Sequence, residues 1–149
     1  RYPGLISWVT EPGGGTTDYA VEIFYEAIRK GSYTCFLKPD AQLDMMYMPD
    51  AIKGSIDVME ADPARLINRN AFNIAAMQFT PEDLAAAIRK HIPDFTIDYD
   101  VDPLRQGIAE SWPRRLDDSA AREEWGWEPD FDLDAMVEDM LVNLRKKLA

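Results

Sequence analysis

Apolar residues recur along the chain in two alternating patterns, one typical of strands and one typical of helices. Short β-branched and aromatic runs predict strands at Leu5–Val9, Tyr33–Leu37, Ala71–Ala75 and Phe95–Tyr99, and Met45–Met48 is a further apolar run. Helical spacing predicts helices over Asp18–Lys30, Pro49–Ala61, Thr80–His91, Asp118–Trp125 and Asp132–Leu148. Strands that alternate with helices indicate an α/β fold.

Residues at the ends of these predicted helices support their bounds. Thr80 is suited to the N-cap position and Pro81 to the first helical position that follows it. Gly31 and Gly126 stand where left-handed C-caps are common. Asp132 is placed to cap the last helix, whose acidic first turns and basic end suit the helix dipole.

Composition excludes several classes of partner. The chain has 149 residues, enough for one domain, and 16 Lys and Arg against 27 Asp and Glu give a net charge of −11. Such a charge argues against nucleic acid and anionic membrane surfaces as partners. No apolar run approaches the roughly 20 residues of a membrane span. The single Cys35 fits a reducing, cytoplasmic compartment, and one Cys with one His makes a zinc site unexpected.

The first residues predict that the sequence is a segment of a longer protein. The chain begins with Arg1 rather than Met, and residues 1–9 read as a strand already under way. No polar lead-in or signal peptide precedes that strand. The alternative is a complete small domain with a short non-native start.

The Gly-rich segment before the first helix has two interpretations. Gly13–Asp18 lacks the Lys-Ser/Thr of a P-loop and the spaced glycines of a dinucleotide turn, and its acid would repel phosphate. One interpretation is a flexible loop in which Thr17 or Asp18 caps the helix. The other is a mobile substrate loop, in which two hydroxyls and a carboxylate hold an ammonium or hydroxyl group.

Other chemistry-bearing residues also have structural interpretations. Trp112, in the predicted loop Glu110–Pro113, either packs on the body of the protein or forms a wall of a ligand pocket. The methionines of Met45–Met48 suit a core, His91 suits a solvated helix end, and Glu123–Trp127 suits a helix end anchored by two indoles. The acids of the last helix are interpreted as a solvated face.

Several motifs together resemble the extended short-chain dehydrogenases/reductases, the superfamily that includes NAD-dependent epimerases and dehydratases. Arg1–Gly4 before a strand resembles the strand after that family's Tyr-x-x-x-Lys helix, and Tyr47–Ala51 resembles its tyrosine/aspartate motif. Phe72–Ile74 and the closing run Asp118–Pro129 also match family patterns. One branch, the short-chain-type L-threonine 3-dehydrogenases, is matched more fully, and its motifs are Tyr2–Ser7, Gly15–Ala20, Met45–Ala51 and Ser111–Pro113.

The resemblance implies the C-terminal half of such an enzyme: the last Rossmann strands interleaved with a small α/β substrate-binding lobe over residues 1–149. The family binds NAD on an N-terminal Rossmann half, which is missing here, and oxidises a hydroxyl with a Tyr/Lys pair that is absent from these residues. It also implies a homodimer, with the dimer helices in the missing half.

The resemblance also assigns residues to the site. It implies that Thr16, Thr17 and Asp18 meet L-threonine and that Trp112 closes over it. It implies further that Tyr2, Pro3, Gly4, Leu5 and Ile6 border the nicotinamide. No catalytic residue and no metal ligand is expected in this segment.

Two alternatives remain open. One is a sugar-nucleotide epimerase or dehydratase lobe, which is disfavoured because few basic residues are available for a diphosphate, although Arg114 and Arg115 are candidates. The other is an acidic α/β binding module without catalytic activity. An upstream Gly-rich turn and Tyr-x-x-x-Lys motif would distinguish an enzyme from such a module.

Overall fold

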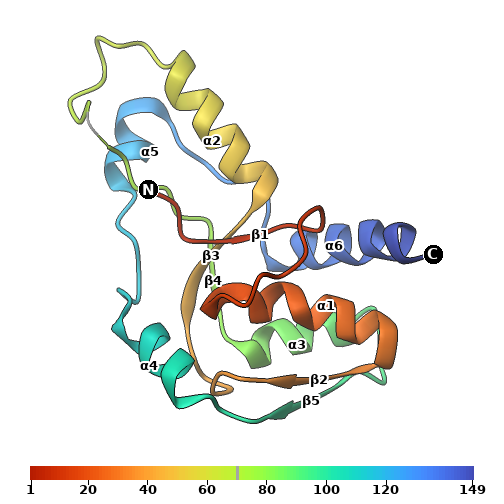
Figure 1. Ribbon diagram of the computed structural model, residues 1–149. Helices are drawn as coiled ribbons and strands as arrows, with labels where there is room; N and C mark the ends of the chain where they lie inside the picture. Colours follow the sequence, from red (N-terminus) through yellow and green to blue (C-terminus); the bar gives the residue numbers. More distant parts are fainter. Residues whose placement is uncertain (70) are drawn as a thin grey trace.

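The computed structural model describes residues 1–69 and 71–149, which form two small sheets surrounded by helices (Figure 1). The first sheet has the order β1-β3-β4, with β1 at Gly4–Ile6, β3 at Leu43–Tyr47 and β4 at Met77–Phe79. β1 and β3 are parallel, and β4 runs antiparallel to β3. The second sheet pairs β2 (Ser32–Cys35) with β5 (Thr96–Tyr99) in parallel.

The helices divide between the two sheets. α1 (Tyr19–Lys30) and α3 (Pro81–Arg89) lie over the β2–β5 sheet, with α6 (Leu133–Leu148) packed against both helices. α2 (Met48–Glu60) and α5 (Ser119–Trp125) stand apart at the other end of Figure 1. A 3-10 turn, η1 (Thr16–Asp18), precedes α1, and α4 (Pro103–Ser111) packs against that turn.

Two hydrophobic cores result from this division. The larger core contains the buried faces of α1, α3 and α6, with Phe24 and Leu144 among its fully buried side chains. The smaller core lies between α2, α5 and β3, where Trp127 packs with Met46 and Ile74. Gly54 is required there, because a Cβ at that position would lie 2.9 Å from Cζ3 of Trp127.

Most predicted elements are confirmed, with bounds shifted by a few residues. Helix signals were the most accurate: Gly31 and Gly126 take left-handed conformations, and Thr80 forms a capping box with Asp83. The Met45–Met48 run is the buried strand β3 with the first residue of α2, and Met45 and Met46 are core residues as predicted. The strand predicted at Leu5–Val9 is shorter and lies at Gly4–Ile6.

One predicted strand is wrong, and one helix was not predicted. Residues 71–75 form no assigned strand; Phe72 and Ile74 instead exchange backbone hydrogen bonds with Arg1 alone, at 2.6 and 3.1 Å. The missed helix is α4, whose N-cap Asp102 accepts hydrogen bonds from the N–H groups of two following residues. An Asp followed by Pro103 is a helix-start signal, so the sequence did contain a marker for it.

Candidate substrate site

The carboxylate of Asp18 organises the Gly-rich loop that precedes it. Its Oδ2 atom accepts hydrogen bonds from the backbone N–H groups of Gly13, Gly14 and Gly15, at 2.7, 2.7 and 2.8 Å. Gly14 has φ of +95°, a conformation in which a side chain would be strained. The three glycines thus wrap their amides around one carboxylate oxygen.

This geometry changes the interpretation of Asp18 as a helix cap. Asp18 occupies the N-cap position of α1, yet its side chain makes no capping hydrogen bond. The carboxylate points back into the loop instead, so the prediction that the Asp18 or Thr17 side chain caps this helix is wrong. Within residues 1–69 and 71–149, Oδ1 of Asp18 accepts no side-chain or loop hydrogen bond and keeps its acceptor capacity.

The structure brings the Thr16–Asp18 turn against β1. Gly4 is buried there, and a Cβ at this position would lie 2.7 Å from Cγ2 of Thr17 and 2.6 Å from Sδ of Met45. Only glycine therefore lets the turn approach the strand so closely. The residues that the sequence assigned separately to cofactor and to substrate, Gly4 and Thr17, are in contact.

The residues before and within β1 differ in what they can offer a ligand. Gly4 and Ile6 are buried by the chain's own atoms, whereas Pro3 and Leu5 are half-buried and Tyr2 is exposed. The Tyr2 hydroxyl lies 2.5 Å from Oγ of Ser55 on α2. An apolar ring placed against this strand would therefore meet Pro3 and Leu5 as side chains, and Gly4 and Ile6 as backbone.

Trp112 stands at the C-cap of α4, immediately after Glu110 and Ser111, which are helical and not part of a loop as predicted. Its side chain is 41% exposed, so it is not a core residue. It lines a pocket of about 500 Å³ together with Lys38, Gln42 and Arg114. This is a different set of residues from Thr16–Asp18, so the static structure does not unite Trp112 with the Asp18 loop in one pocket.

A polar network that the sequence did not reveal fixes the helix that carries Trp112. The buried Gln106 accepts a hydrogen bond from the backbone N–H of Lys38 and donates one to Glu110, each at 2.9 Å. Lys38 and Glu110 also form an ion pair of 2.8 Å, which raises the pKa of Lys38 and lowers that of Glu110. α4 is thus tied to the turn after β2.

α4 also reaches the Gly-rich loop from its other end. The Arg105 guanidinium stacks 4.1 Å over the ring of Phe36, and its NH2 group would lie 4.0 Å from a Cβ at Gly14. One short helix therefore touches the Asp18 loop through Arg105 and ends at Trp112. A shift of α4 would move both features together.

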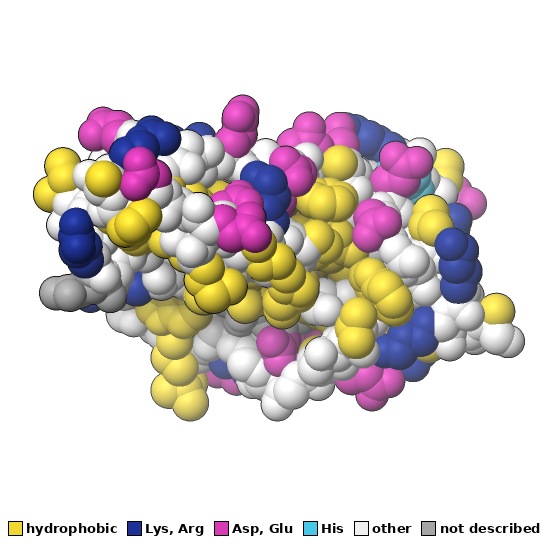
Figure 2. Space-filling model, turned by 90° about the horizontal axis from the view of Figure 1, so that it is seen from above, with side chains coloured by type: hydrophobic (Ala, Val, Ile, Leu, Met, Phe, Trp, Pro, Cys, Tyr) yellow, Lys and Arg dark blue, Asp and Glu magenta, His cyan; other side chains and the backbone are white. Residues whose placement is uncertain are grey.

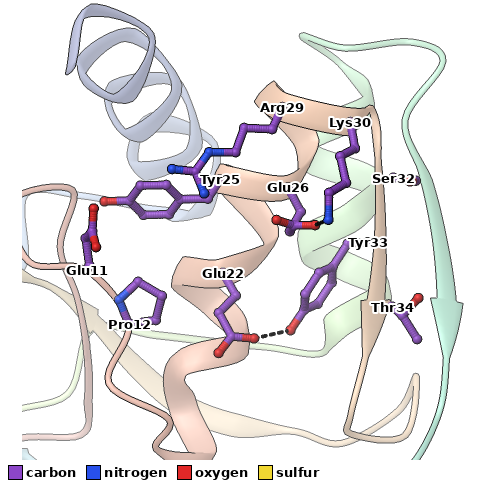
Figure 3. Close-up of a pocket in the computed structure, with 10 residues that line it drawn as sticks. All are labelled: Glu11, Pro12, Glu22, Tyr25, Glu26, Arg29, Lys30, Ser32, Tyr33 and Thr34. Atoms are coloured by element: carbon purple, nitrogen blue, oxygen red, sulfur yellow. Dashed lines mark hydrogen bonds and ion pairs between the residues drawn. The ribbon is translucent and has the colours of Figure 1, made fainter. Parts of the chain in front are cut away.

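A larger pocket lies away from all of these residues (Figure 3). It has a volume of about 540 Å³ between α1, β2 and the segment Glu11–Pro12. Much of its charge is paired within the pocket: Tyr33 donates to Glu22 at 3.0 Å, and Lys30 lies 2.5 Å from Glu26. It contains none of the residues nominated from the sequence.

The tyrosine/aspartate motif has a structural role in this chain. Asp50 is fully buried and accepts backbone hydrogen bonds from Asp130 and Phe131 at 2.9 and 3.2 Å, while burial raises its pKa. Tyr47 is equally buried and donates to Asp139 at 2.6 Å. Both motif residues therefore anchor the segment that leads into and forms α6, and Asp139 departs from the solvated face predicted for that helix.

The remaining candidates have the structural roles that the sequence suggested. His91 is exposed at the end of the α3 region. Trp125 and Trp127 pack together with ring centroids 5.8 Å apart, and Trp127 donates its indole N–H to the carbonyl of Ala75 at 2.9 Å. Among the described residues, no three His, Cys, Asp or Glu side chains cluster as metal ligands. No helix in the described part of the chain is long and apolar enough to cross a membrane.

Comparison with known proteins agrees with the fold and the motifs. No protein-family model matches the chain. An uncharacterized epimerase/dehydratase of Staphylococcus haemolyticus is 56% identical over 147 residues, which are 99% of this chain and 46% of that protein. The chain thus spans about half the length of the curated relatives it matches.

Solved structures extend this similarity. L-threonine dehydrogenase from Phytophthora infestans is 58% identical with a TM-score of 0.95, covering 99% of this chain and 47% of that one. L-threonine dehydrogenase from Clostridium difficile is 56% identical with a TM-score of 0.96, covering 99% and 46%.

These similarities define a class of protein. The chain has the sequence and fold of the C-terminal half of the epimerase/dehydratase-like short-chain dehydrogenases. More particularly, it is similar along nearly its whole length to the C-terminal half of the L-threonine 3-dehydrogenases of that class.

Proposed function

We propose that this chain is the substrate-binding half of an NAD-dependent L-threonine 3-dehydrogenase, which oxidises L-threonine to 2-amino-3-ketobutyrate. The observation that carries the proposal is the contact between the Thr16–Asp18 turn and β1, in a chain 58% identical to a solved L-threonine dehydrogenase. That contact joins the proposed substrate residues to the proposed cofactor residues at Gly4 and Thr17.

Asp18 is suited to hold the substrate's ammonium group. Its Oδ2 is fixed by three loop amides, and these leave Oδ1 as a preorganised anionic acceptor. A charge-assisted hydrogen bond from an ammonium to such an oxygen is stronger than one between neutral groups. The hydroxyls of Thr16 and Thr17 are the neighbouring groups that we assign to the rest of the amino acid.

Trp112 is assigned to closure over the bound substrate. In the present conformation it lines the neighbouring pocket, so closure requires movement of α4 or of the residues after it. An indole placed over the reacting carbon would exclude water from hydride transfer. The Gln106 network sets the resting position from which this movement starts.

NAD, when bound, accepts the hydride from the substrate carbon. In this chain Tyr2, Pro3, Gly4, Leu5 and Ile6 are assigned to the border of the nicotinamide. The half-buried Pro3 and Leu5 fit the edge of a flat ring, and the backbone at Gly4 permits close approach. The residues that hold the dinucleotide phosphates and remove the hydroxyl proton are assigned to the part of the relatives that this chain does not cover.

The test restores that part. The chain is co-expressed with the N-terminal half of the Clostridium difficile L-threonine dehydrogenase, and NADH formation is followed by absorbance with L-threonine and NAD. We expect turnover by the pair and none by the 149-residue chain alone. Clear turnover by the chain alone, or activity of the pair on a nucleoside diphosphate sugar but not on threonine, would contradict the proposal.

A further inference from the structure

Helix α2 carries an apolar stripe that nothing in the described chain covers. Ile52, Ile56 and Met59 follow one another at helical spacing and are 54%, 44% and 75% exposed. The opposite face of the same helix is buried, with Gly54 packed tightly against Trp127. A helix that is apolar on both faces is characteristic of one buried on both sides.

The stripe continues into the segment that leads to β1. Tyr2 is 48% exposed and is tied to the flank of α2 by the 2.5 Å contact between its hydroxyl and Oγ of Ser55. β1 itself is an edge strand of the three-stranded sheet in the described residues. Figure 2, which views the molecule from the α2 side, shows apolar side chains exposed among the charged ones. Tyr2, Ile52, Ile56 and Met59 are called the α2 seam below.

Two physical requirements show what kind of structure covers the seam. β1 and β3 are parallel strands, and parallel sheets occur almost only where both faces are covered by helices. An open edge strand also invites pairing with another strand. Both requirements are met by one α/β unit that adds a parallel strand beside β1 and a helix against α2.

We propose that the α2 seam and the outer edge of β1 are the docking surface for an α/β half equivalent to the part of the relatives that this chain does not cover. The relatives extend well beyond the match, since the chain covers 46% of one and 47% of another. The inference rests on the proposed function for the identity of that half. A second copy of this chain is a poorer occupant, because two chains of net charge −11 repel each other.

The test measures assembly rather than catalysis. The tagged chain is co-expressed with the N-terminal half of the Clostridium difficile enzyme, and the purified product is sized by light scattering. We expect a complex with one copy of each half. A dimer of the tagged chain without the other half, or a tagged chain that purifies alone, would overturn the proposal.

Matched substitutions locate the surface. Ile56 on the seam and Val142 on α6 are almost equally exposed, at 44% and 43%. Ile56→Lys should reduce the co-purified half at least tenfold, whereas Val142→Lys should leave it unchanged. Met59→Lys is the second seam variant, because its 75% exposed side chain contributes little to the fold of this chain itself.

Thermal unfolding of the purified chains checks that the substituted chains remain folded. Equal co-purification of both seam variants and the Val142 control would contradict the proposal. A complex that assembles through the seam yet forms no NADH from threonine would leave the docking surface standing and reject the proposed function. Threonine turnover that survives both seam substitutions would reject the docking surface alone.

Discussion

The hydroxyl of Tyr47 lies 2.6 Å from Oδ2 of Asp139 and donates a hydrogen bond across 92 residues of sequence. Three residues further on, the Asp50 carboxylate accepts hydrogen bonds from the backbone of Asp130 and Phe131. The junction of β3 and α2 is therefore the point at which the C-terminal segment is attached. The burial and the acceptor raise the pKa of Tyr47, so its hydroxyl remains a donor throughout the neutral range.

We predict that Tyr47→Phe destabilises the fold by about 1.5–3 kcal/mol, because it removes a hydrogen bond to a charged group and leaves a carboxylate without its donor. Urea unfolding followed by circular dichroism measures this change. Tyr99→Phe is the control, since Tyr99 also donates to a carboxylate, that of Glu82, but at an exposed position. Equal losses in the two variants would show that burial of the Tyr47 pair has no special effect.

Asp18→Asn should weaken threonine binding about ten- to a hundredfold, the equivalent of a charge-assisted hydrogen bond of roughly 1.5–3 kcal/mol. The assembled enzyme is required, and KM for NAD is measured as an internal control. The loop role of Asp18 makes a second ligand necessary. 3-Hydroxybutyrate lacks the ammonium group, so its inhibition constant should change little if Asp18 binds that group. An equal loss for both ligands would assign Asp18 to loop organisation alone.

Trp112→Ala should leave stability almost unchanged, because the indole is 41% exposed at the end of α4. In the assembled enzyme it should lower kcat/KM for threonine, since closure and water exclusion need the indole only when substrate is bound. A melting scan beside a rate assay separates the outcomes. A core tryptophan would instead cost about 3–5 kcal/mol on truncation to Ala. A large fall in Tm with normal kinetics would therefore contradict the assignment.

A pH-dependent contribution is expected where α3 meets β5. Glu82 accepts hydrogen bonds from Tyr99 at 2.7 Å and from Arg89 at 2.9 Å, and these two donors lower its pKa from the usual 4.5. A lowered folded-state pKa stabilises the fold above pH 4.5, and this contribution is lost as the pH falls through the folded-state value. Because the Arg89 pair is largely exposed, we expect only about 0.2–1 kcal/mol.

Urea midpoints of the parent chain and of Glu82→Gln, measured between pH 3 and pH 7, test this expectation. The stability difference between the two proteins should be greatest at neutral pH and shrink on acidification. A difference that is constant with pH would show that Glu82 acts through packing rather than charge.

Local signals in the sequence predicted most helices because caps are local chemistry. Gly31, Thr80 and Gly126 occupy the cap positions that their residue types indicate. The strand predicted at residues 71–75 was wrong for a non-local reason: a strand is defined by its partner, and here only Arg1 pairs with it. The Asp102–Pro103 signal for α4 was local and could have been recognised.

The candidate site was less predictable. Sequence motifs nominated Asp18, yet nothing in them showed that three glycine amides would occupy one of its oxygens. The contact between Gly4 and Thr17 depends on how closely a turn approaches a strand, which no spacing along the chain reveals. Gln106 carried no motif at all, because its role comes from burial beside Lys38.

The attachment of α6 has a consequence for synthesis on the ribosome. Tyr47 and Asp50 appear early, but their partners lie at positions 130–139, and Leu144 is still part of the larger core. A chain made from its N-terminal end, at about 5–20 residues per second, therefore holds the apolar faces of α1 and α3 without their covering helix until almost the last residue is added. During that interval the nascent chain offers a chaperone the same surface that α6 later occupies.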